Sequence, residues 1–217
     1  MATTLDLQEQ EQIDELKAFW KRWGTLLTWA VIAALAGFAG WNGWNWYQRE
    51  QGVKAGVLFD ELDRTVAGGD VERAARIFSD LRERHAGTTW TAHAGLLVAK
   101  LQHERGKSEE SAGTLVWVAE KASDPALQTV ALLRLAGLHL DAKKPDAALE
   151  VLARATAPGF EAVVADRRGD VLRAQGKATE AVEAYKAAHQ KMTDTLDYRR
   201  LVEAKLTSLG APVAAAR

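Results

Sequence analysis

One uncharged stretch limits what this chain can fold into more than any other feature of the sequence. Residues 24–47 contain no acidic or basic side chain. At about 1.5 Å per residue, a helix of this length reaches roughly 35 Å, enough to cross the roughly 30 Å hydrocarbon core of a bilayer. The stretch predicts a transmembrane helix. Aromatic side chains that favour membrane–water interfaces flank both of its ends: Trp20, Trp23, Trp41, Trp44, Trp46 and Tyr47.

Two other interpretations of this stretch are weaker. The buried core helix of a soluble protein rarely runs so long without a charge. A cleaved signal peptide has a short basic start and an apolar run of about 7–15 residues. Here five acidic side chains precede a longer run, and the best cleavage match, Ala34-Leu35-Ala36, would lie in mid-membrane. We therefore expect an uncleaved, single-pass anchor.

Basic residues near the span indicate its orientation. Lys17, Lys21 and Arg22 lie on its N-terminal side, whereas Arg49 and Lys54 are the nearest on the other side. The positive-inside rule places the richer flank in the cytoplasm. The large C-terminal part is then expected across the membrane.

The N-terminal segment, residues 1–23, has the pattern of an amphipathic helix. Ile13, Leu16, Trp20 and Trp23 recur three and four residues apart on one face. Such a helix would dock on the membrane surface or on a partner, or would simply extend the anchor helix into solvent. The sequence leaves both alternatives open.

Small residues form two stripes within the span, at Ala33 and Gly37 and at Ala36 and Gly40. Small side chains four residues apart let membrane helices approach closely. We expect these four residues as contacts for another membrane helix.

Composition excludes several functions for the rest of the chain. Residues 1–49 hold five of the 29 acidic and four of the 28 basic side chains, so the remainder is neutral and nucleic acid is not an expected partner. The absence of cysteine excludes disulfides, thiolate metal sites and a cysteine nucleophile. The abundance of alanine and leucine, with four prolines, predicts helices.

After a polar linker, expected at residues 48–56, one pattern recurs four times. A turn position is followed five residues later by a small residue, and four residues after that by a large one. The turn positions are 37, 37 and 33 residues apart. The four sets are Gly69, Ala74 and Phe78; Gly106, Ser111 and Leu115; Lys143, Ala148 and Leu152; and Gly176, Ala181 and Tyr185.

This pattern predicts a stack of helical hairpins over residues 57–210. A left-handed residue permits the tight reversal, the small residue lets the two helices approach, and the large residue fills the gap to the next pair. The expected fold is all-α, a right-handed α-solenoid of about four hairpins. A helix at 194–209 would cap its open end, and residues 211–217 would form a tail.

The pattern resembles the tetratricopeptide repeat. The last unit matches best, at Gly169, Leu172, Gly176, Ala181, Tyr185 and Ala188. The third unit keeps Gly137 as the early glycine but has Lys143 at the turn. The second has Ala99 and Ser111 at the early glycine and central alanine positions.

The whole chain also resembles the YfgM-type ancillary subunit family of the bacterial Sec translocon. The likeness lies in the architecture and in residues 11–20, Glu-Gln-Ile-Asp-Glu-Leu-Lys-Ala-Phe-Trp. The resemblance implies an inner-membrane anchor with periplasmic repeats, bound to SecYEG and to a PpiD-type chaperone. It also implies that the repeats assist newly translocated polypeptides, with membrane lipid around the anchor.

No catalytic pattern stands out. The five histidines never occur three or four residues apart, as a helical metal site requires, and no phosphate-binding loop is complete. We expect no enzyme, no metal and no cofactor. Asp166, Asp170 and Arg173 share a helix face expected to line the groove, which makes them candidate peptide contacts. The alternative function is a scaffold for another envelope process, such as division or cytochrome maturation.

Overall fold

The computed structural model describes residues 7–192 and 197–212, and within these ranges it is helical without strands. The chain divides into two compact units, residues up to Glu50 and residues from Gln51, which are considered separately. The helices are α1 (Leu7–Ala67), α2 (Val71–Arg84), α3 (Thr89–Glu104), α4 (Ser108–Lys121), α5 (Pro125–Asp141), α6 (Pro145–Ala153), α7 (Glu161–Ala174), α8 (Ala178–Lys191) and α9 (Asp197–Ser208).

The first unit is the N-terminal part of α1. Among the described residues, this is the one helix long and apolar enough to cross a membrane. Its large apolar side chains are exposed, as those of a helix surrounded by lipid would be; Leu35 and Phe38 are examples. The helix continues through residues 23 and 24, so the amphipathic segment and the uncharged stretch are parts of one element.

Residues 48–56, expected as a linker, are also helical and belong to α1. Their packing explains why. Ala55 is fully buried in the first hydrophobic cluster of the second unit, beside Leu62 of the same helix and Ala74 of α2. Tertiary burial therefore outweighs the polar character of the segment and its two glycines.

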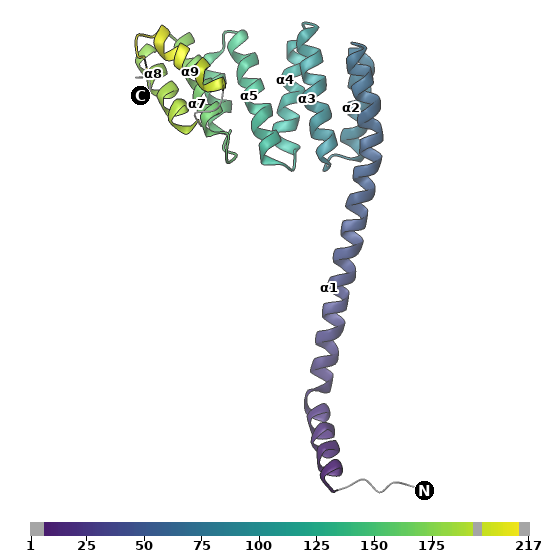
Figure 1. Ribbon diagram of the computed structural model, residues 1–217. Coiled ribbons are helices and arrows are strands. Elements are labelled where there is room, and N and C mark those ends of the chain that lie inside the picture. The colour runs from purple at the N-terminus through teal and green to yellow at the C-terminus, as the bar shows by residue number, and fades with distance from the viewer. Residues whose placement is uncertain (1–6, 193–196, 213–217) are drawn as a thin grey trace. The chain divides into compact units, whose positions relative to one another are not determined.

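The second unit is a stack of helix pairs, which follow one another in chain order from α2 to α9 (Figure 1). The four predicted turn positions all adopt the left-handed conformation. Gly69, Gly106, Lys143 and Gly176 have φ angles of 74°, 77°, 58° and 76°. The repeat boundaries read from the sequence are confirmed.

The small and large positions of the four sets are confirmed as core positions. All eight side chains are buried, and none is more than 4% exposed. Four clusters make the core continuous along the stack: Trp117 packs against the first two, Val151 against the middle two and Leu149 against the last two.

The last helix closes the stack. Val202 and Leu206 of α9 are fully buried against α8, in a cluster with Tyr185. The cap expected at 194–209 therefore exists as α9, while residues 194–196 of that expectation lie outside the described residues.

The prediction that Gly137 is the early glycine of the third repeat is wrong by one position. Seven residues before each turn lie Leu62, Ala99, Ala136 and Gly169, and Ala136 is fully buried. Gly137 is the next residue of α5, and a Cβ atom added to it would meet nothing within 4 Å. Gly137 has the residue type of the repeat pattern, but Ala136 occupies the equivalent position on the buried face of α5.

Gly169 is required where Gly137 is not. A Cβ atom on Gly169 would lie 2.5 Å from the Cε1 atom of Tyr185, whose ring is fully buried. We expect Gly169→Ala to lower the free energy of unfolding by about 1–3 kcal/mol through overpacking. The matched variant Gly137→Ala should raise it by about 0.5–1 kcal/mol, because alanine is the better helix former.

Chemical denaturation of the full-length protein in detergent, followed by circular dichroism, measures both changes. Equal effects of the two substitutions would contradict the packing assigned to Gly169.

Candidate functional site

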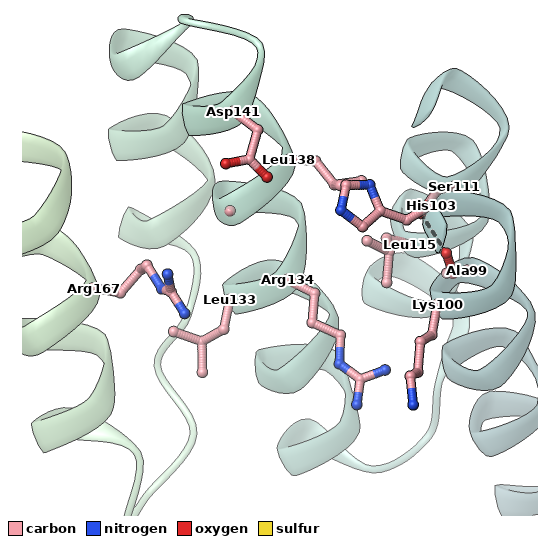
Figure 2. Close-up of a pocket in the computed structure, with 11 residues that line it drawn as sticks. Ala99, Lys100, His103, Ser111, Leu115, Leu133, Arg134, Leu138, Asp141 and Arg167 are labelled. Carbon is pink, nitrogen blue, oxygen red and sulfur yellow. Dashed lines mark hydrogen bonds between the residues drawn. The ribbon is translucent and has the colours of Figure 1, made fainter. Parts of the chain in front are cut away.

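A hollow with charged groups on its rim lies across α3, α4, α5 and α7. It has a volume of about 440 Å³. Its floor is apolar, formed by Ala99 and Leu115 on one side and by Leu133 and Leu138 on the other. We call it the concave pocket (Figure 2).

A hydrogen bond supports this floor. The Ser111 hydroxyl, at the central alanine position of the second repeat, donates to the Ala99 carbonyl oxygen over 2.7 Å. The two positions at which this repeat departs from the tetratricopeptide pattern are thus bonded to each other. The bond satisfies a hydroxyl that is almost completely buried.

The rim of the concave pocket is predominantly basic. Lys100 comes from α3, Arg134 from α5 and Arg167 from α7, and the one acidic side chain is Asp141. Figure 2 shows Arg167 pointing from α7 toward α5, where Leu133 and Arg134 lie. His103 adds an imidazole.

Arg134 differs from the other two cations. Lys100 has Glu104 at 3.7 Å and Arg167 has Asp170 at 3.8 Å, whereas no described carboxylate lies within 4.0 Å of the Arg134 guanidinium. Its Nη1 atom donates to the Leu96 carbonyl oxygen over 2.9 Å. Arg134 is exposed on the rim, and partial desolvation lowers its pKa while leaving it charged at neutral pH.

Gly137 also lines the concave pocket. Because a Cβ atom there would meet nothing within 4 Å, its hydrogen leaves open space beside the α5 backbone. The pocket can therefore accept an anionic group at Arg134 and an apolar group over its leucines.

Two of the groove residues expected from sequence face the cap instead. Asp166 is 1% exposed, and its carboxylate accepts hydrogen bonds from Lys205 at 2.8 Å and from the Tyr198 hydroxyl at 2.5 Å, both on α9. Burial, and then the bond to Asp166, raises the pKa of the Tyr198 phenol, so it remains a donor.

Asp170 belongs to the same cluster. It lies 2.7 Å from the Lys205 ammonium and accepts from the Tyr185 hydroxyl at 2.9 Å. Arg173, the third expected residue, is exposed on α7. The structure brings the two aspartates together at the cap, and no ion pair among the described residues joins Arg173 to either of them.

The four small residues expected as membrane-helix contacts, Ala33, Ala36, Gly37 and Gly40, are all exposed on α1. Cβ atoms added to the two glycines would meet nothing within 4 Å. A contact with another membrane helix stays a prediction.

Sequence reasoning missed the basic rim, although a signal was available. Arg134 and Arg167 both stand nine residues before a turn position, in the third and fourth repeats. Lys100 and Gly137 both stand six residues before one, in the second and third repeats. Comparing equivalent positions between repeats would have placed these side chains on one surface.

Comparison with known proteins identifies a domain family and close relatives. The tetratricopeptide repeat-like domain family matches residues 17–211. An ancillary SecYEG translocon subunit of Neisseria gonorrhoeae is 29% identical over 94% of this chain and 98% of its own length. The subunit of the same name from Escherichia coli is 30% identical over 82% of this chain and 86% of its own. That of Haemophilus influenzae is 26% identical over 85% and 90%.

The cap cluster yields a stability prediction. Lys205→Met leaves the buried Asp166 carboxylate without its cation, and we expect a loss of about 3 kcal/mol in the free energy of unfolding. The matched variant Lys186→Met on α8 breaks an exposed pair with Glu183 and should change it by less than about 0.5 kcal/mol. Urea denaturation compares the two, and similar losses would contradict a role for the buried pair.

Proposed function

We propose that this chain, which belongs to the family of ancillary SecYEG translocon subunits, is a membrane-anchored tetratricopeptide repeat-like protein associated with the Sec translocon. The observation that carries the proposal is the extent of the similarity. It covers nearly the full length of the Neisseria gonorrhoeae relative, and the domain family matches both the apolar part of α1 and the repeats. The runner-up, a scaffold for another envelope process, has no comparable support.

The proposed location is the bacterial inner membrane, crossed once by residues 24–47. The basic residues before the span support a cytoplasmic N-terminus and a periplasmic repeat unit. Membrane lipid surrounds the anchor, and the small residues from Ala33 to Gly40 offer a face for a helix of the channel.

The proposed work of the repeat unit is binding rather than catalysis. A tether to the translocon keeps the concave pocket at a high effective concentration near polypeptides that have just crossed the membrane. The pocket binds such segments. Together with a PpiD-type periplasmic chaperone, it assists their handover or folding. Tetratricopeptide-like stacks suit this task because they present an extended concave surface.

Association with the translocon is tested by purification from native membranes in mild detergent. We expect SecYEG and the periplasmic chaperone to co-purify with the tagged chain. A control in which residues 24–47 are replaced by an unrelated apolar span should recover less SecYEG, because the small-residue face is lost. Isolation of the intact chain with neither partner would overturn the proposal, and crosslinking from the pocket to division or cytochrome-maturation proteins would favour the runner-up.

Orientation is tested with reporters fused after Arg217. Alkaline phosphatase, which requires the periplasm, should be active there, and a fluorescent protein that matures only in the cytoplasm should be dark. The same reporters fused before the span should behave in the opposite way. A phosphatase active only in the N-terminal fusion would reverse the proposed topology.

A further inference from the structure

We propose that the concave pocket binds an extended polypeptide segment through an acidic side chain, which pairs with Arg134 while a neighbouring apolar side chain covers the leucine floor. This deepens the proposed function and rests on it, since it names the segments that the repeat unit would recognise among emerging polypeptides. The recognised feature is a glutamate or aspartate beside a large apolar residue.

Charge is the first step. The pocket rim has three cations and one acidic group, in a repeat unit that is neutral as a whole. Within the described chain, Arg134 has a backbone carbonyl oxygen as partner and no carboxylate within 4.0 Å. The other two cations of the rim already have carboxylate neighbours, Glu104 for Lys100 and Asp170 for Arg167. A guanidinium such as that of Arg134 is best completed by a carboxylate, which its planar fork can bind through two parallel bonds.

The backbone of α5 is the second step. Gly137 lies mid-helix, where glycine costs about 1 kcal/mol relative to alanine, and no packing contact requires it. It stands one position after the buried Ala136 and three after Arg134, so it opens the pocket next to the guanidinium. A glycine at such a position lets a bound chain approach the helix backbone closely.

The apolar floor is the third step. Leu115, Leu133 and Leu138 line the same pocket as the basic side chains (Figure 2). Leu115 is 2% exposed and Leu133 9%, so they form a firm surface. An apolar side chain placed there gains about 25 cal/mol for each Å² removed from water, which adds to the charge pairing.

A second hollow of the repeat unit shows the contrast. It is larger, about 670 Å³, and lies along α6, α7 and α8. Its charged lining is Glu161, Arg168, Glu180 and Glu183, so it would repel a carboxylate. The acidic segment is therefore assigned to the concave pocket.

The test is a fluorescence-anisotropy titration of the full-length protein in nanodiscs. The probe is a short fluorescein-labelled peptide with a single glutamate between two leucines in a serine and glycine context, blocked at both termini. A second probe has glutamine in place of the glutamate. Because no translocon is present, the result does not depend on whether SecYEG co-purifies, and the two proposals can fail separately. We expect the glutamate peptide to bind about tenfold more tightly, as one charge-assisted hydrogen bond would give.

Three variants locate the binding. Arg134→Gln should abolish the difference between the two peptides. Gly137→Leu, which favours the helix but fills the pocket, should weaken binding of the glutamate peptide by about tenfold while the protein stays folded. Arg168→Gln, in the second hollow, should leave both affinities within about twofold of the parent protein.

Three outcomes of these measurements would overturn the proposal. These are equal affinity for the two peptides, unchanged binding by Arg134→Gln or Gly137→Leu, and no binding of either probe at about millimolar concentration. Two further arms test other anions. Displacement of the glutamate peptide by equimolar inorganic phosphate would overturn the proposal in favour of a general anion site, and equal binding of a glutamine peptide with a free C-terminus would overturn it in favour of recognition of chain ends.

Discussion

Close approach of the two helices in each hairpin is the constraint on which the rest of the repeat unit depends. Each approach needs a left-handed residue at the turn and a small residue five positions later. Lys143 shows how strongly the stack imposes this geometry. It holds a φ of 58°, at a cost of about 1 kcal/mol for a residue with a Cβ atom, because its amide bonds to Leu140 and that of Lys144 bonds to His139 at 2.9 and 2.8 Å. Packing against neighbouring pairs overrides the local preference.

A stack of this kind always leaves an apolar face at its end, and α9 covers it here. Apolar burial of Val202 and Leu206 supplies attraction but little direction. The direction comes from the buried Asp166 carboxylate, which fixes where Lys205 and Tyr198 of α9 must lie. A buried ion pair often adds little net stability, because desolvation offsets the attraction between its charges. The pair of Asp166 and Lys205 therefore fixes the position of α9, in addition to any stability that it contributes.

The sequence was sufficient to predict the long apolar helix, the four turns and the eight core positions, because each follows from residue types in a fixed arrangement. It was insufficient wherever one residue of rotation on a helix decides the outcome. Asp166 and Arg167 are adjacent, yet a step of about 100° puts the first in the cap cluster and the second on the pocket rim. The same step separates Ala136 from Gly137. Such differences are settled by which neighbour packs on which face, and this information lies outside the repeat itself.

The concave pocket contains two features that do not serve the packing of the stack. A mid-helix glycine without a packing role acts against folding, and it lies within one turn of Arg134, a guanidinium with no carboxylate partner among the described residues. Departures from local consistency that gather at one place are typical of binding sites. A single charge pairing over a small apolar floor gives weak affinity by itself, and such affinity suits a chain that must be released again. A tether makes weak binding sufficient, because it replaces an encounter in solution by one at high effective concentration.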